Sequence, residues 1–292
     1  MRCRRLHLPI QAQAFQPSLR RFVTNMTKAE TKTSPRRFAP LRDTQTHTHT
    51  HAHLPRLQGI IFDVDGTLCL PQNYMFAQMR AALQIPPTID ILAHVASLPT
   101  PAAREHAMES VRAIERAAMA AQEPQPGLAP LMAYLGARGV RKAICTRNFA
   151  QPVAHLLDRF LAGVDFAPVV TRDFLPPKPD PAPLLFIARS WGLVRRRRVG
   201  AEAGTDQHQV QENEEEEEEV GDASALLMVG DSIDDMTAGR RAGAATVLLV
   251  NNDNAHLAEH PHTDLVIASL DELVDVLEAG FVGREIQHVA SG

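Results

Sequence analysis

The sequence predicts an α/β fold built on a parallel sheet. Three short segments rich in apolar residues, 59–62, 140–145 and 226–230, each end abruptly at polar residues. Such segments are typical of strands buried on both faces of a parallel sheet. Between them, apolar residues recur at helical spacing, most clearly over 104–120. Since ligands of open α/β sheets bind beyond the carboxyl ends of the strands, we expect a site where the polar residues meet.

Two carboxylates follow the first of these strands. The apolar run 59–62 leads directly into Asp63, Val64 and Asp65. Side chains at positions i and i+2 of an extended segment share a face, so Asp63 and Asp65 are expected to point the same way. Adjacent carboxylates cost folding free energy unless a metal ion or a reaction uses them. Gly66 then allows a sharp turn, because glycine adopts positive φ without a Cβ clash.

The segment 71–126 is expected to form a small helical cap inserted after the first strand. Its apolar residues follow helical spacing, and it lacks polar residues at a strand end. Met108, Ile114 and Met119 are expected to pack between helices of this cap.

Later predicted strands end in further polar residues, which the sheet would bring close to Asp63. They are Thr146 after the strand 140–145, Lys178 in a proline-rich turn after the strand 169–170, and Asp231 and Asp235 after the strand 226–230. Asp234 is expected only to complement the dipole of the helix that follows. Arg147 and Asn148 could touch a ligand, but they fit a polar loop equally well, and we leave them out of the catalytic set.

With these four motifs, the chain resembles the haloacid dehalogenase superfamily hydrolases of the phosphatase type. The motifs are Asp63 to Thr67, Thr146, Lys178 within 176–181, and Gly230 to Asp235, and the resemblance covers residues 59–281. Four motifs in order are hard to produce by chance. The resemblance implies a Rossmann-like sheet with helices on both faces. The types it resembles, phosphoglycolate phosphatase and β-phosphoglucomutase, carry a cap that covers the pocket and selects the substrate.

The resemblance implies a Mg²⁺-dependent phosphatase that hydrolyses a small phosphorylated metabolite through an aspartyl-phosphate. Asp63 is the expected nucleophile, and Asp65 the expected general acid and base. Thr146 is expected to offer its hydroxyl and its backbone N–H to the phosphate, and Lys178 to add positive charge.

A divalent cation is also expected from the charges. Two unit charges about 4 Å apart at an effective dielectric of about 20 repel by roughly 4 kcal/mol, so a phosphate dianion needs a counter-cation among these carboxylates. Carboxylate and carbonyl oxygens favour Mg²⁺. The resemblance implies that the metal residues are Asp63, Asp65 through its backbone carbonyl, Asp231 and Asp235.

Three alternative functions stay open. A phosphomutase of the same family would share Asp63 and Asp65. A 2-haloacid dehalogenase is weaker, because dehalogenases of this superfamily lack the second Asp and need no metal. A non-catalytic regulator with the family fold would have no need for both carboxylates.

Composition limits the partners. The chain has 292 residues, 45% of them hydrophobic, and a formal net charge of −4. This charge gives no general attraction to nucleic acid or to anionic membranes, and no apolar run approaches the ~18 residues of a membrane span. Three cysteines do not make a disulfide framework. We expect a monomer or weak dimer, with no nucleic acid or membrane partner.

Two regions differ from the α/β core, which is expected over 58–70 and 127–292. Residues 1–57 are expected to be a disordered extension. Its basic start suggests a mitochondrial transit peptide, and the alternative is an extended start before Met26 in a cytoplasmic enzyme. The segment 195–223 is expected to be a solvated, low-complexity charged insert, and the His/Thr tract over 46–53 a linker.

Overall fold

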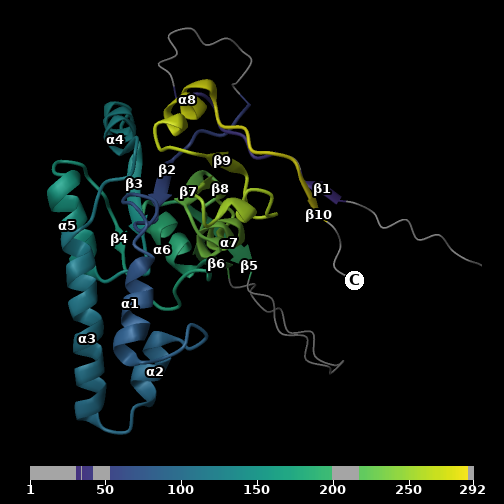
Figure 1. Ribbon diagram of the computed structural model, residues 1–292. Coiled ribbons are helices and arrows are strands. Elements are labelled where there is room, and N and C mark those ends of the chain that lie inside the picture. Colours follow the sequence, from purple (N-terminus) through teal and green to yellow (C-terminus); the bar gives the residue numbers. More distant parts are fainter. Residues whose placement is uncertain (1–30, 34, 42–52, 199–216, 289–292) are drawn as a thin grey trace, which may run out of the picture.

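Six parallel strands form the central sheet of the computed structural model, which describes residues 31–33, 35–41, 53–198 and 217–288. Their order is β4-β3-β2-β7-β8-β9 (Figure 1). The strands are β2 (Gly59–Phe62), β3 (Arg141–Cys145), β4 (Val169–Val170), β7 (Leu226–Gly230), β8 (Ala245–Leu249) and β9 (Leu265–Ile267). The predicted parallel α/β fold is confirmed. The strands β3, β2 and β7, which precede Thr146, Asp63 and Asp231, are direct neighbours in this sheet.

Helices cover both faces of the sheet. The helices are α4 (Leu128–Ala137), α5 (Ala150–Phe160), α6 (Ala182–Ser190), α7 (Ile233–Ala242) and α8 (Glu272–Ala279), with a short 3-10 helix at Ala255–Leu257. Ile60 and Phe62 of β2 pack in one cluster with α4, α5 and α8, while Ile61 packs in a second cluster with α6 and α7. Burying one such side chain contributes about 1.5–3 kcal/mol, so helices on both faces stabilise the apolar strand β2.

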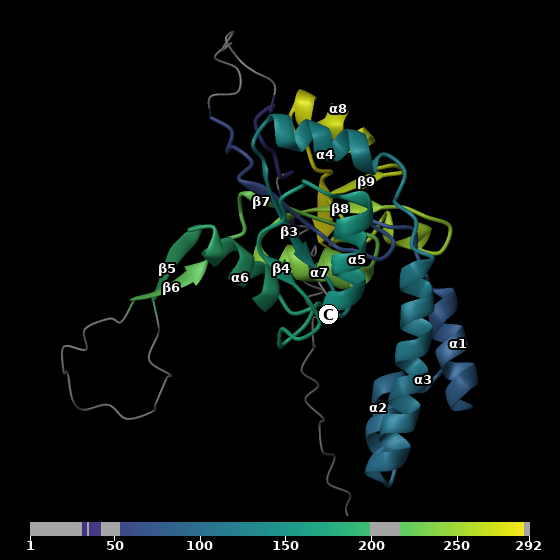
Figure 2. The ribbon, with the colours of Figure 1, turned by 90° about the vertical axis from the view of Figure 1, so that its left-hand side faces the viewer.

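Three helices lie between β2 and α4, in the segment 71–126: α1 (Tyr74–Leu83), α2 (Ile91–Ser97) and α3 (Pro101–Ala120). Figure 2 shows them together beyond one end of the sheet. The Thr100 hydroxyl caps α3 by accepting the Ala103 N–H at 3.1 Å. Met108 and Ile114 pack in the cluster that joins these helices, whereas Met119 is half-buried and lies outside it. Among the described residues, no helix is long and apolar enough to cross a membrane.

The prediction that residues 1–57 are disordered is wrong for 35–41 and 53–57. Phe38 is only 3% exposed, and its ring centroid lies 5.7 Å from that of Phe281. The Phe38 N–H donates to the Phe281 carbonyl at 3.0 Å. Nearby, β1 (Thr31–Thr33) pairs antiparallel with β10 (Ile286–His288). Phe38 is therefore part of the core, while the predicted transit peptide and most of the His/Thr tract lie outside the described residues.

Replacing Phe38 by Ala tests this attachment. Removing a buried Phe ring leaves a cavity, so we expect the Phe38→Ala variant to lose about 3 kcal/mol of unfolding free energy in urea titrations. Arg37→Ala is the control, because Arg37 is exposed and should change the unfolding free energy by less than about 0.5 kcal/mol. Equal stability of the two variants would contradict a core role for this segment.

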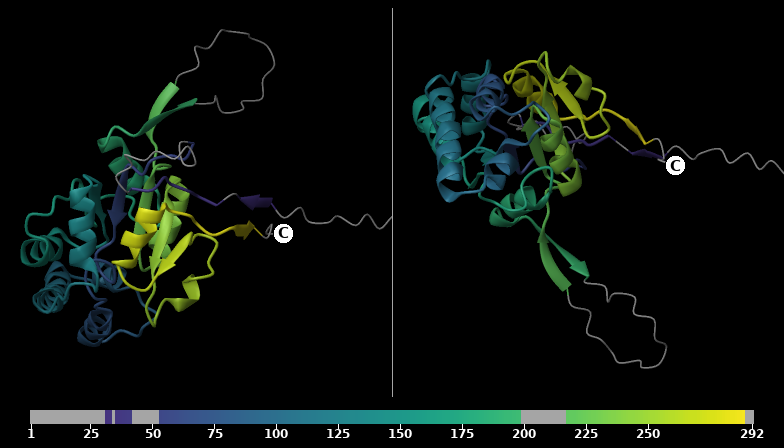
Figure 3. Two further views of the ribbon diagram at one scale, coloured as in Figure 1. Left: turned by 90° about the horizontal axis from the view of Figure 1, so that it is seen from above. Right: turned by 60° about the horizontal axis from the view of Figure 1, so that its bottom comes forward.

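The two ends of the predicted low-complexity insert are mostly exposed to solvent, as predicted, but they have regular structure. They form an antiparallel pair, β5 (Val194–Arg198) and β6 (Glu217–Gly221), in which Arg197 lies opposite Glu218. Opposite charges across an antiparallel ladder stabilise it by about 0.2–1 kcal/mol a pair. The hairpin points away from the sheet (Figure 3). Residues 199–216 of the predicted insert lie outside the described residues.

Candidate active site

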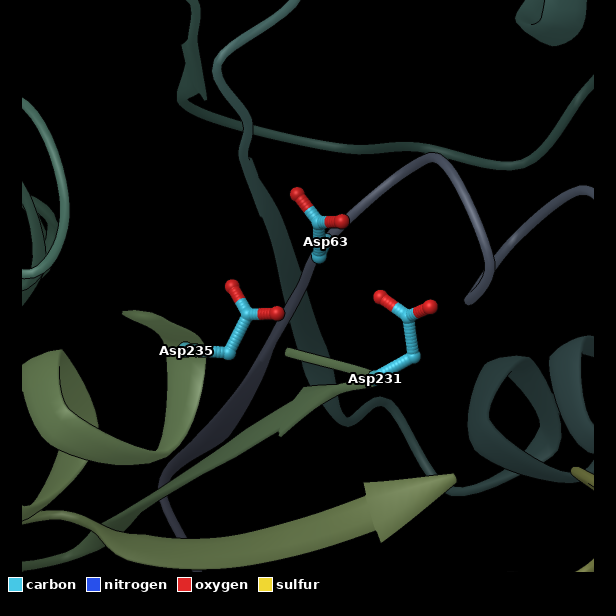
Figure 4. A group of neighbouring side chains, drawn as sticks. All are labelled: Asp63, Asp231 and Asp235. Atoms are coloured by element: carbon cyan, nitrogen blue, oxygen red, sulfur yellow. The ribbon is translucent and has the colours of Figure 1, made fainter. Parts of the chain in front are cut away.

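Three acidic side chains meet at the carboxyl end of the sheet. Asp63 follows β2, Asp231 follows β7, and Asp235 lies in the first turn of α7. One carboxylate oxygen from each lies within 4.8 Å of the others, and Figure 4 shows the three carboxylates converging. The predicted convergence of strand ends is confirmed for these residues.

A sharp turn after Asp63 leaves room for this group. Gly66 has a φ of 78°, as the sequence predicts, and a Cβ there would lie 2.0 Å from Asp231 Oδ2. Any side chain at this position would therefore both strain the turn and push Asp231 out of the group.

Lys178 supplies the positive charge. Its Nζ lies 2.7 Å from Asp63 Oδ1 and 2.5 Å from Asp235 Oδ1, and its side chain is 3% exposed. Burial alone would lower the pKa of Lys178, but the ion pairs with Asp235 and Asp63 outweigh it and raise this pKa. The ammonium therefore stays charged inside the protein.

Asp235 is held on both of its oxygens. Oδ1 accepts from Lys178, and Oδ2 accepts from the Ser232 N–H at 3.1 Å and from the Ser232 hydroxyl at 2.6 Å. The Ser232 hydroxyl in turn accepts the Asp235 N–H at 3.3 Å, which completes a capping box at the start of α7. The helix start thus fixes Asp235, and Asp235 fixes Lys178.

The negative charges of these buried carboxylates cost folding free energy. Burial raises the pKa of Asp63 to about 7, although Lys178 opposes the rise. Burial and repulsion by Asp63 and Asp235 raise the pKa of Asp231 to about 8. A cation beside these oxygens would remove that repulsion, and carboxylate oxygens are the donors that hard divalent ions prefer. The residues therefore fit a divalent cation of the Mg²⁺ type.

Asp65 lies apart from the three carboxylates. Its Oδ2 accepts from Asn148 Nδ2 at 2.8 Å, and its Oδ1 lies 3.5 Å from Cys69 Sγ. Burial raises the pKa of Asp65, and the hydrogen bonds from Asn148 and Cys69 oppose that rise. Metal binding through the backbone carbonyl of Asp65 stays a prediction.

The structure corrects one detail at Thr146. Its backbone N–H donates to the Val170 carbonyl at 2.9 Å, so the expectation that this N–H binds phosphate is wrong: pairing with β4 uses it. The hydroxyl oxygen accepts the Asn148 N–H at 3.2 Å, and its own hydrogen can still be donated to a ligand.

Sequence reasoning missed three supporting residues. Ser232 could have been found from its capping-box spacing to Asp235. Asn254, whose Nδ2 donates to the Asp231 carbonyl at 2.7 Å, lies in a loop after β8 without a recognisable pattern. The sequence does not distinguish Asn148 from an ordinary polar loop residue. Asp234, as expected, lies outside the acidic group and pairs with Arg147.

Comparison with known sequences agrees with these motifs. A family model for haloacid dehalogenase-like hydrolases matches residues 57–243. The chain is 38% identical over 228 residues to the uncharacterized hydrolase YOR131C of Saccharomyces cerevisiae, covering 77% of this chain and 91% of the yeast protein. It is 26% identical over 252 residues to N-acetylmuramic acid 6-phosphate phosphatase of Pseudomonas aeruginosa, covering 76% and 96%.

Solved structures share the fold. CbbY from Rhodobacter sphaeroides, in complex with phosphate, matches with a TM-score of 0.54 and 20% identity, covering 74% of this chain and 96% of CbbY. A putative phosphoglycolate phosphatase from Lactobacillus plantarum matches with a TM-score of 0.54 and 18% identity, covering 75% and 99%. Because the family model spans β2 to α7 and the yeast relative matches along most of both chains, the protein belongs to the haloacid dehalogenase-like hydrolases.

Proposed function

We propose that the protein is a Mg²⁺-dependent phosphatase that hydrolyses a small phosphorylated metabolite through an aspartyl-phosphate on Asp63. The observation that carries the proposal is the buried acidic group with Lys178 at the carboxyl end of the sheet. The similarity to a phosphatase of a sugar 6-phosphate supports a phosphorylated small molecule as substrate. A monomeric or weakly dimeric state, and a mitochondrial or cytoplasmic location, are part of the proposal.

Asp63 is the nucleophile in this mechanism. Lys178 holds Asp63 Oδ1, so that Oδ2 can attack phosphorus in line with the leaving oxygen. A divalent cation held by Asp63, Asp231 and the carbonyl of Asp65 would offset the repulsion between the carboxylates and the phosphate dianion. Asp235 acts by fixing Lys178, whether or not it also binds the metal.

Asp65 handles the proton in both steps. In the first, the Asp63–phosphorus bond forms, the bond to the leaving oxygen breaks, and Asp65 gives its proton to that oxygen. In the second, Asp65 takes a proton from water as the water oxygen attacks phosphorus, which frees Asp63 and releases phosphate. The Thr146 hydroxyl and Lys178 stabilise the charge on the transferring group.

The helices α1–α3 are the cap in this proposal. Among their contacts with the α/β core, Nδ2 of Asn73, the residue before α1, lies 3.4 Å from Asp253 Oδ2, and Glu115 Oε1 of α3 lies 3.8 Å from Arg172 Nη1. A cap held this way can exclude water from the reaction and select the leaving group.

The direct test is release of inorganic phosphate. We expect turnover of p-nitrophenyl phosphate in the presence of Mg²⁺, its loss on chelation with EDTA, and its return when Mg²⁺ is restored. Activity that persists after chelation would contradict the proposed function. Product analysis with a hexose phosphate separates the phosphomutase alternative, because a mutase yields an isomeric sugar phosphate instead of free phosphate.

Metal binding should also be visible without turnover. An unfolded Asp has a pKa of about 3.9. The raised pKa values of about 7 for Asp63 and about 8 for Asp231 mean that the metal-free protein loses stability as pH rises from about 4 to about 8. We therefore expect Mg²⁺ to raise Tm more at pH ~8 than at pH ~5. At about 100 times its Kd, the ion should stabilise the fold by about 2.7 kcal/mol.

Asp231→Asn should remove this gain in Tm, and Asp234→Asn is the matched control. Asp234 lies on the same segment but outside the acidic group, so its variant should keep the full gain. A Mg²⁺ effect that survives in Asp231→Asn would place the ion elsewhere.

A further inference from the structure

The carboxylate of Asp65 is oriented by an amide from a different strand end. Asn148, in the loop between β3 and α5, donates from Nδ2 to Asp65 Oδ2 at 2.8 Å. Both side chains are half-buried, so water competes with this hydrogen bond less than it would at the surface. The thiol of Cys69, 3.5 Å from Oδ1, is a weak donor and constrains Asp65 much less.

This contact determines which oxygen of Asp65 carries a proton. An amide –NH₂ can only donate, so the Oδ2 that faces Asn148 must accept. When Asp65 is protonated, its hydrogen therefore sits on Oδ1. Without Asn148 only the weak contact with Cys69 would distinguish the two oxygens, and the hydrogen could sit on either of them.

Arg172, which follows β4, fixes the loop that carries Asn148. Its backbone N–H donates to the Asn148 carbonyl at 3.0 Å, and its Nε donates to the Arg147 carbonyl at 3.0 Å. The guanidinium carbon lies 3.8 Å from the centroid of the Phe149 ring, and Nη1 lies 3.8 Å from Glu115 Oε1 of α3. Arg172 thus contacts three successive residues, 147–149, through its backbone and its side chain, and its side chain also lies near Glu115 of α3.

We infer that Asn148 is a positioning residue for Asp65 and that Arg172 holds its loop in place. The inference rests on the proposed function, in which Asp65 protonates the leaving oxygen. The proton moves from Asp65 Oδ1 to that oxygen as its bond to phosphorus breaks and the bond from Asp63 forms. Asn148 itself does not touch the reacting atoms.

Two substrates with different leaving groups distinguish this positioning role from a general structural role. Phenyl phosphate needs its leaving oxygen protonated, whereas 2,4-dinitrophenyl phosphate has a far more acidic leaving phenol and does not. We expect Asn148→Ala to lower kcat/KM about 100-fold for phenyl phosphate and less than about 3-fold for the dinitrophenyl ester. Asn148→Asp should be worse on phenyl phosphate, because a carboxylate beside Oδ2 draws the proton there. Arg172→Lys should show the same selectivity with a loss of about 10-fold.

Arg147→Gln is the matched control on the same loop. The Arg147 side chain is 61% exposed and pairs with Asp234, so this variant should keep both kcat/KM values. Equal losses on the two esters in Asn148→Ala, or no loss on either, would overturn the inference.

A crystal structure of Asn148→Ala decides the inference without turnover. We expect the Asp65 side chain to occupy more than one rotamer, and an unchanged single rotamer would overturn the inference. If the wild type released phosphate from neither ester, the proposed function would be contradicted, and the crystal structure would still report on the role of Asn148.

Discussion

Asp63→Asn is expected to lower kcat for an aryl phosphate by roughly 10⁴-fold or more. An amide of the same shape can still accept a hydrogen bond from Lys178, but it cannot form the aspartyl-phosphate. The first covalent step is therefore lost while the surrounding geometry is kept. The measurement is the rate of phosphate release under saturating Mg²⁺. A second readout is covalent phosphate on the peptide that contains residue 63, detected by mass spectrometry after acid quench of the wild type.

The stability of Asp63→Asn shows whether its loss of activity comes from the missing nucleophile or from unfolding. Because burial raises the pKa of Asp63 to about 7, the wild-type carboxylate is held at a cost above that pH, and a neutral amide avoids this cost. Asp63→Asn should therefore unfold at the same or a higher temperature than the metal-free wild type at pH ~8. Asp234→Asn controls for the loss of a nearby carboxylate and should retain activity. Turnover above about a tenth of the wild-type rate would mean that Asp63 is not the nucleophile.

The parts of the site that the sequence predicts are those attached to buried strands. Asp63, Thr146 and Asp231 each directly follow a mostly buried strand, so recognising the strand locates the residue. Because β3, β2 and β7 are adjacent and parallel, their ends must meet. Gly66 was predictable for a similar reason, because the chain has to turn at once after the second Asp.

The parts that sequence reasoning missed depend on distant partners. Phe38 lies in a polar, basic stretch, and its burial depends on Phe281 at the other end of the chain. The Arg run of β5 becomes a strand because the Glu run of β6 pairs with it, which local composition does not encode. Asn148 belongs to a polar loop, and only the turn that places Asp65 beside it gives it a role. Pairing across the fold, not local pattern, decides each of these cases.

Replacing Lys178 by Met should reduce both catalysis and stability. The variant keeps a similar volume but leaves the carboxylates of Asp63 and Asp235 without their shared cation. Loss of one such electrostatic contact typically lowers kcat by about 10²–10³-fold. Breaking a buried ion pair costs about 3–5 kcal/mol of unfolding free energy. Lys178 lowers the pKa of Asp63, so its removal should raise this pKa further, and the stability loss should be larger at pH ~8 than at pH ~5.

Lys142→Met provides the matched control. Lys142 is a buried lysine of β3 whose Nζ donates to the Val140 carbonyl at 3.2 Å, outside the acidic group. Its variant should keep kcat and show no such dependence of stability on pH. In the double variant Lys178→Met with Asp235→Asn, the second change removes one of the two uncompensated charges, so stability at pH ~8 should partly return while kcat stays low. If both stability and kcat returned, Lys178 would serve only the fold. If stability alone returned, the charge of Lys178 would be needed for the reaction.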